Sequence, residues 1–199
     1  HVVANSRQSD VMVLSLANPH ISSSYNPLSE GTPEQVAERV FSTFDLTDPY
    51  YGPLQFSALR TMIALLVRRG ERPMPSVIRE LLRNQDVQAI LNDKDEDFQK
   101  KYSGLVTALG HFSQGTTAKL FNTRSSEIDL MDAIKRRKII YFQLPTMQFP
   151  FLAATTGKLI LQSLQSVVSQ IHVEGKRPDK LFSVYLDDFN DYLYPGFAS

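Results

Sequence analysis

The stretch KIIYFQLP, residues 138–145, decides the fold class because it is a short, continuous apolar run closed by a proline. A run of this kind is typical of a strand that is buried on both faces. A long helical pattern follows it, from about Pro150 to His172, and a second apolar run, LFSVYLDD, covers residues 181–188. Strand, long helix and strand in this order predict a βαβ unit in a parallel sheet.

A third apolar run, VMVLSL at residues 11–16, predicts another buried strand, and a polar loop follows it. Between that loop and residue 125 every periodic segment is helical. The clearest helix start is Thr32-Pro33-Glu34-Gln35, where the threonine can cap, the proline suits the first helical position and the glutamine can complete a capping box. The expected helices cover about 32–44, 53–70, 77–82, 86–92 and 95–112, with a brief one at 130–137 capped by Asp129.

The sequence therefore predicts a mainly helical α/β protein in which an all-α block interrupts an α/β frame. Three segments are expected. Residues 1–31 supply a strand and a loop of the frame, residues 32–125 form the all-α inserted domain, and residues 126–199 return to the frame with the βαβ unit.

The composition limits the classes of function. With 199 residues, 42% of them hydrophobic, the chain can bury a sizeable core, and its 21 Lys and Arg balance its 21 Asp and Glu, so no global field favours nucleic acid. The absence of cysteine excludes disulfides and thiolate metal sites. No apolar segment approaches the roughly 20 residues of a spanning helix, so the chain is expected to be soluble. The histidines share no metal-ligand spacing: His1, His20, His111 and His172.

Paired carboxylates, Asp187 and Asp188, end the last apolar run. Ligands of parallel α/β sheets bind at the carboxyl ends of strands, where one acid can hold magnesium through water and a neighbouring acid can orient an attacking water. The alternative reading is that Asp187 caps the following turn and Asp188 faces solvent.

A phosphate-binding loop would strengthen the first reading, but the chain has no GxxxxGK[ST] motif. Its nearest approach is Thr155-Thr156-Gly157-Lys158, where Leu152 stands at the first glycine position and Leu159 follows the lysine. The match also falls inside a helical pattern without a preceding strand. We therefore expect Lys158 to be an ordinary helix residue, and the chain alone not to hydrolyse a nucleotide.

Basic side chains recur through the helical region and are candidates for contact with nucleic acid or another cargo. Several on one surface would track a phosphate backbone, with Tyr50, Tyr51 or Phe112 stacking on bases. The alternative is that they serve helix ends and solvation. The candidates are Arg68, Arg69, Arg72, Arg79, Arg83, Lys100 and Lys101, and Lys119 and Arg124 follow in the same region. The densest basic run, residues 135–138, is most simply a solubilised helix end.

The order of these features resembles the coupling ATPases of type IV secretion and conjugation systems, over almost the whole chain. The resemblance rests on the tetrapeptide YNPL at 25–28, on the segment IDLMDAIK leading into the strand at 139, and on the apolar run that ends at Asp187. It implies a RecA-like P-loop nucleotide domain that carries an inserted all-α domain. In that family the insert recognises the cargo, which is DNA with its relaxase or a protein effector.

By position, the resemblance implies that Asp187 is the Walker B acid holding magnesium through water and that Asp188 is the catalytic acid. The family typically has glutamate at the second position, and aspartate is one methylene shorter. The resemblance further implies ATP and magnesium as cofactors of a homohexameric ATPase at the cytoplasmic face of the bacterial inner membrane, with other secretion-system subunits as partners.

Because the chain begins at His1 without an initiator methionine, we expect it to be a piece of a longer protein. The phosphate loop and the membrane helices are then expected upstream, and the piece alone is expected to be a monomer without its own cofactor. Two other readings stay open. One is a non-enzymatic helical adaptor, and the other is a DNA-pumping ATPase of the FtsK/HerA type, against which a helical insert of about ninety residues argues.

Overall fold

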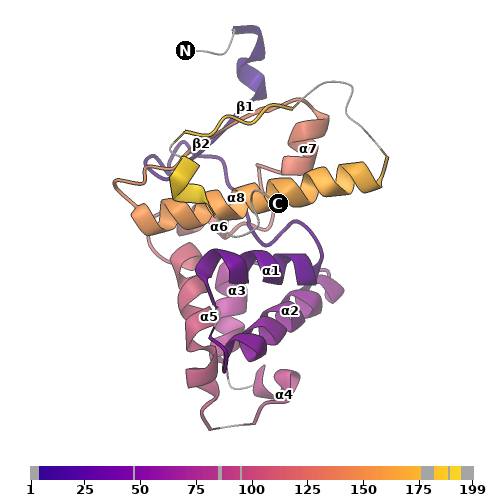
Figure 1. Ribbon diagram of the computed structural model, residues 1–199, viewed down its shortest axis with the longest axis vertical. Helices are drawn as coiled ribbons and strands as arrows, with labels where there is room; N and C mark the ends of the chain where they lie inside the picture. The colour runs from indigo at the N-terminus through magenta and orange to yellow at the C-terminus, as the bar shows by residue number, and fades with distance from the viewer. Residues whose placement is uncertain are drawn as a thin grey trace.

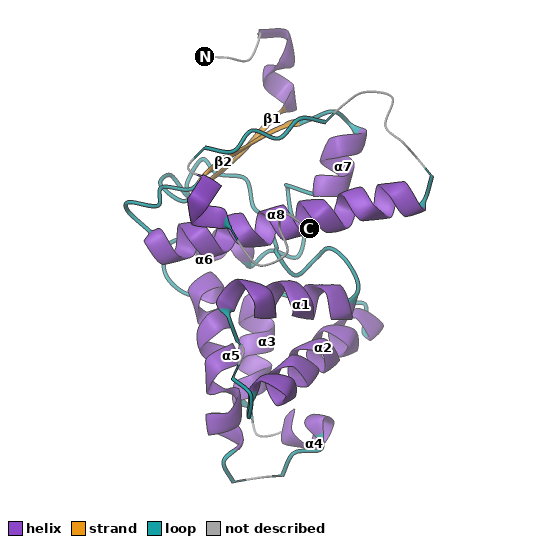
Figure 2. Ribbon diagram, in the orientation of Figure 1, coloured by secondary structure: helices purple, strands orange, loops and turns teal. Residues whose placement is uncertain are grey.

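The computed structural model describes residues 5–46, 48–84, 87–94, 96–175, 182–187 and 189–193. Most of these residues are helical, and strands β1 (Val11–Ser15) and β2 (Ile139–Gln143) form a small parallel sheet (Figure 2). The register pairs Val11 with Ile139 and Ser15 with Gln143. The prediction of a mainly helical protein with a parallel sheet is confirmed.

The expected helices appear in the expected order along the chain. The helices of the structure are η1 (Asn5–Asp10), α1 (Pro33–Phe44), α2 (Gly52–Arg68), α3 (Pro75–Arg83), α4 (Val87–Leu91), α5 (Phe98–Ser113), α6 (Ala118–Phe121), α7 (Leu130–Lys135), α8 (Pro150–Val173) and η2 (Phe189–Tyr192). Three of these helices, the short η1, α6 and η2, were not predicted from the sequence. Within the ranges given above, no helix has the length and apolar character needed to cross a membrane.

Helix α8 separates the molecule into two parts (Figure 1). The sheet and α7 lie on one side of it, and the helical block of α1 to α5 lies on the other. Each part has its own apolar core: one is built within the helical block, and the other lies among the sheet, α6, α7 and α8. Helix α1 packs on α8, and the His111 ring at the end of α5 contacts Phe151 of α8.

Two helix starts form through the local chemistry that the sequence predicts. The Thr32 hydroxyl accepts from the Gln35 N–H, and the Gln35 side chain accepts from the Thr32 N–H, which completes a capping box at the start of α1. The Asp129 carboxylate accepts from the Asp132 N–H at the start of α7. Both predictions are confirmed, because a cap depends on residues within one turn.

Helix α5 begins at Phe98, three residues later than expected. The acidic segment before it folds back on the first turns of the helix instead of extending them. Asp93 pairs with Lys101 at 3.1 Å, and it accepts a hydrogen bond from the Tyr102 hydroxyl, also at 3.1 Å. A tertiary contact of this kind sets the helix start here, so the local pattern misplaced it.

The prediction of a strand at LFSVYLDD is wrong for the residues that the structure describes. Residues 182–186 have no strand assignment and form no ladder with β2. Their large side chains are exposed, from 38% for Phe182 to 92% for Tyr185. The βαβ unit is therefore present as its first strand and its helix only. The reason is that a parallel strand needs cover on both faces of the sheet, and the outer face of β2 is open at Tyr141, which is 57% exposed.

Candidate functional site

A groove of about 1390 Å³ runs along the whole of β2. Strand β2 and residues 182–187 form its walls, together with side chains of α7 and α8. The lining is mainly apolar, with Ile140, Phe142, Ile160, Leu164 and Val184 among its members. The basic side chains Arg7, Lys135, Arg137 and Lys138 line it near the start of β2, and Asp187 and Tyr192 also line it.

Asp187, the predicted magnesium ligand, is exposed at this groove. Helix η2 begins two residues later and brings the Tyr192 hydroxyl within 3.5 Å of the Leu144 carbonyl oxygen, one residue past the end of β2. Asp187 therefore lies toward the carboxyl end of β2, the end at which the sequence places ligand chemistry. Asp188 lies outside the described residues.

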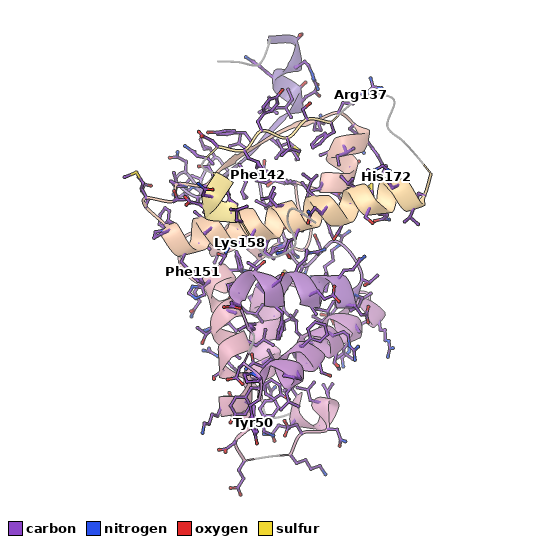
Figure 3. All side chains as sticks on the ribbon, in the orientation of Figure 1. Tyr50, Arg137, Phe142, Phe151, Lys158 and His172 are labelled. Atoms are coloured by element: carbon purple, nitrogen blue, oxygen red, sulfur yellow. The ribbon has the colours of Figure 1, made fainter. Side chains whose placement is uncertain are left out.

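The described residues supply one candidate magnesium ligand and no cradle for phosphate. Magnesium is usually held by one or two carboxylates together with waters and the phosphate oxygens of its nucleotide. Asp187 fits that role, although the described part of the chain has no cluster of three or more acidic or histidine side chains suited to a metal. Residues 155–158 lie in the middle of α8, where Figure 3 shows Lys158, so the prediction of an ordinary helix residue is confirmed.

Gly157 has a packing role in that helix. A Cβ atom at this position would lie 2.2 Å from Cδ1 of the Tyr192 ring, far inside van der Waals contact. The absence of a side chain thus lets η2 dock on α8. Of the two tyrosines in DYLYPGF, Tyr192 is anchored in this local contact, and Tyr194 lies outside the described residues.

Six of the seven basic candidates divide between the two ends of α3, and Arg79 lies in the middle of that helix. Arg68, Arg69 and Arg72 are exposed where α2 ends and the chain turns toward the start of α3. Arg83 ends α3, and its carbonyl oxygen accepts from the Gln99 side chain at 3.3 Å, which places it beside Lys100. The two ends of a nine-residue helix are about 12 Å apart.

Two members of the set are engaged within the block. Lys101 and Asp93 form an ion pair in which both side chains are largely buried. Arg79 is half-buried at the contact between α3 and α5, and its Nε has no hydrogen-bond partner. These two side chains stabilise or fill the block, and the exposed arginines and Lys100 are left as surface candidates.

The aromatic candidates also differ in access. Tyr50 is 77% exposed at the end of the block farthest from α8 (Figure 3), and its ring meets that of Tyr51 edge-on at 4.9 Å. Phe112 is buried between Phe44 and Phe121. Phe112 therefore belongs to the core and is not available for stacking on a base.

The tetrapeptide YNPL is a buried neck between the two parts of the molecule. All four residues, 25–28, are buried, and Tyr25 belongs to the core beside the sheet whereas Leu28 belongs to the core of the block. The Tyr25 hydroxyl donates to Ser163 Oγ of α8 at 2.9 Å. Its backbone N–H donates to the Leu120 carbonyl oxygen at 2.7 Å, which joins the chain entering the block to the chain leaving it.

Asn26 holds this neck together with its side chain. Its Nδ2 donates to the carbonyl oxygens of Pro73 at 2.8 Å and Thr123 at 3.0 Å, and its Oδ1 accepts from the Leu28 N–H at 3.0 Å. Three segments far apart in the sequence converge on one buried amide. Arg72 and Arg124 each adjoin one of the carbonyls that it binds, so these two exposed arginines lie near one another at the neck.

The contact between α1 and α8 is polar, which the sequence did not predict. Ser42 Oγ donates to Gln162 Oε1 at 2.9 Å, Arg39 NH1 contacts Ser166 Oγ at 3.5 Å, and Arg39 NH2 donates to the Glu30 carbonyl oxygen. Arg39 and Gln162 are nevertheless buried. We call this contact the α1–α8 seam.

The seam leaves several buried polar atoms without partners. They are Arg39 Nε, Thr43 Oγ1, Gln162 Nε2 and, beside the seam, Glu30 Oε2. A neutral hydrogen bond contributes about 1 kcal/mol, and a buried polar group without a partner costs roughly 1–3 kcal/mol. Burial raises the pKa of the Glu30 carboxyl and lowers the pKa of the Arg39 guanidinium, which are the directions expected when charges lose water. The seam is therefore weakly favourable at best.

A signal for the seam existed in the sequence. Arg39 and Thr43 are one helical turn apart on α1, and Val36 and Val40 on the neighbouring stripe are buried as well. A helix with apolar residues on one stripe and polar residues on the next is usually half solvated. Nothing local showed that a second helix would cover the polar stripe.

Comparison with known proteins does not supply an identity. No protein family, no curated protein and no solved structure matches this chain. The function must therefore be inferred from the chain itself.

Proposed function

We propose that this chain is the cargo-recognition region of a type IV coupling ATPase, an all-α block carried on part of a RecA-like nucleotide domain that couples ATP hydrolysis to export. One observation carries the proposal. The helical block is inserted between two adjacent parallel strands, and the chain enters it through the buried YNPL neck. A separately folded block on a parallel α/β frame suits a module that contacts cargo while the frame performs nucleotide chemistry.

The small size of the sheet supports the proposal that it is part of a larger α/β domain. A two-stranded parallel sheet with one open face is marginal by itself, because parallel sheets are normally covered on both faces. The groove along β2 has the position that further strands of such a sheet would occupy. In this proposal residues 182–186 pair beside β2 in the complete domain, and Asp187 holds magnesium through water when ATP is bound.

DNA is the cargo that the exposed charges favour. Arg72 and Arg124 adjoin the two carbonyls that Asn26 binds at the neck, Arg68 and Arg69 lie at the end of α2 a few residues earlier in the chain, and all four arginines are exposed. Arginines on one surface neutralise phosphates, and each phosphate contact adds about 0.9 to the slope of log affinity against log salt. Arg83 and Lys100 lie at the other end of α3 and provide an internal control.

The test is fluorescence anisotropy of labelled single- and double-stranded DNA with the intact chain, titrated with salt. We expect binding that weakens steeply with salt, and we expect Arg68→Ala/Arg69→Ala/Arg72→Ala to lower the salt slope by about 2–3. The control variant Arg83→Ala/Lys100→Ala, which removes two charges at the other end of α3, should leave the slope unchanged.

Absence of binding at low salt would exclude the DNA branch. A protein cargo, or a helical adaptor without enzymatic function, would then be the better reading. If each variant lowered the salt slope in proportion to the number of charges removed, the charges would act through the net charge of the chain and not through a binding site.

A further inference from the structure

The α1–α8 seam has three stretches of different character. At one end the rings of Phe44, Phe112 and Phe151 pack together, with centroids 5.5 and 6.1 Å from that of Phe44. The middle is the polar contact of Ser42 with Gln162 and of Arg39 with Ser166. These pairs show that the two helices run antiparallel, because the higher number on α1 meets the lower number on α8.

The other end of the seam is hollow. A cavity of about 600 Å³ lies between the start of α1, at Gly31, Thr32 and Gln35, and residues 166–173 of α8, and Asp129 and Met131 at the start of α7 line it as well. The aromatic rings therefore bring the two helices into contact at one end, and the cavity separates them at the other end. Figure 1 shows α1 lying along α8 with the rest of the block below it.

We propose that the seam is a joint with two positions, in which the helical block pivots on the aromatic end and α1 swings away from α8 at the hollow end. The closed position buries Arg39, Thr43 and Gln162 without satisfying Arg39 Nε, Thr43 Oγ1 or Gln162 Nε2. Opening returns these atoms to water and breaks the polar contacts of the middle stretch. The two positions are thus close in free energy, which is the condition for both to be populated.

The neck determines what can move. Asn26 and the bond from the Ser76 N–H to Asn122 Oδ1, at 2.8 Å, hold the start of α3 to the frame. Helix α1 is joined to the frame by the aromatic end, by the polar seam and by the segment of Ser29 to Gly31. In that segment Glu30 Oε1 accepts from the Leu130 N–H of α7 at 2.9 Å, and Gly31 has φ of 98°. The block can therefore tilt about α3 and the end of α5 while the neck stays bonded. This motion is a property of the fold and does not depend on which cargo the block recognises.

The test uses distances between spin labels on cysteines, which can be placed freely because the chain has none of its own. Glu38→Cys on α1 and His172→Cys on α8 are exposed and lie across the seam. Glu38→Cys with Ser57→Cys on α2 reports distances inside the block. Pulsed electron–electron resonance should give two populations for the first pair and one narrow population for the second.

Replacing unpaired polar groups of the seam by apolar groups of similar size should lock the joint. We expect Thr43→Val/Gln162→Met to lower the population at long distance by about tenfold, because the closed form then buries two fewer polar atoms without partners. Ser113→Ala removes a buried, unpaired hydroxyl elsewhere, on α5, and should change nothing. A distribution for the first pair as narrow as that for the second would overturn the proposal, as would a locked variant with unchanged populations.

Discussion

The contact of α3 with α5 and the contact of α1 with α8 both contain buried side chains, but burial stabilises the first contact and leaves polar atoms unpaired in the second. Ile78, Leu82 and Leu105 are all 0% exposed in the first, and removing apolar surface from water contributes roughly 25 cal/mol per Å². Arg39 and Gln162 are 4% and 7% exposed in the second, where burial leaves polar atoms unpaired. The exposed fraction of a side chain therefore does not show whether a contact stabilises the fold.

The largest expected effect separates these two contacts directly. Leu105→Ala should lower the free energy of unfolding by about 3 kcal/mol, because it leaves a cavity in the core of the block. Gln162→Met, at an equally buried site, should leave the free energy of unfolding unchanged or raise it. Urea unfolding followed by circular dichroism measures both, and equal losses in the two variants would break the comparison.

Mutation of the neck should lower the free energy of unfolding as much as mutation of an apolar core, although the neck is held by hydrogen bonds. Asn26→Ala should cost about 2 kcal/mol in the free energy of unfolding, because it leaves the Pro73 and Thr123 carbonyls and the Leu28 N–H buried without their partner. Asn18→Ala, at an exposed position, is the matched control and should be neutral. A neutral result for Asn26→Ala would mean that water replaces the amide and that the neck is not tightly held.

Thr32→Ala tests the start of α1, at the hollow end of the seam. It removes a side-chain cap and should cost about 1 kcal/mol in the free energy of unfolding. Thr107→Ala on the exposed face of α5 should cost nothing, since alanine is the better helix former. Urea midpoints at constant slope distinguish the two variants, and equal midpoints would show that α1 does not depend on its cap.

The smallest expected effect concerns the pH dependence of the seam. Burial raises the pKa of Glu30 in the folded chain above its ordinary value of 4.5, so folding binds protons. The stability that this carboxyl contributes is fully present below about pH 4.5 and is lost as the pH rises through its folded pKa. Glu30→Gln should therefore be more stable than the parent at neutral pH, and the difference should vanish at low pH. If the difference in stability between Glu30→Gln and the parent did not change with pH, the Glu30 carboxyl would not be the titrating group.

Local chemistry was the predictable part of this fold. The caps at Thr32 and Asp129, the two strands and the order of the helices follow from residues within a few positions of one another. Contacts between distant segments were not predictable. The late start of α5 depends on Asp93, and the polar seam depends on a second helix covering Arg39.

The candidate site shows the same division. The apolar runs at 11–16 and 181–188 have similar composition, yet the first forms β1 beside β2 and the described part of the second pairs with nothing. A β-strand forms only when it pairs with a neighbouring strand, and the pattern of residues within one apolar run does not show whether such a neighbour is present. The proposed magnesium ligand Asp187 depends on this second run, so its role as a ligand stays a prediction.

The single neck has an evolutionary consequence. Because Asn26 binds Thr123 directly, the chain leaves the frame and returns to it at nearly the same point. Insertions are tolerated where the two ends of the inserted segment lie close together. The helical block can therefore be exchanged as a cassette, with a short turn or a different block joining the same two ends, while the strands and α8 keep their places. A lineage could change the helical block without rebuilding the frame that carries it.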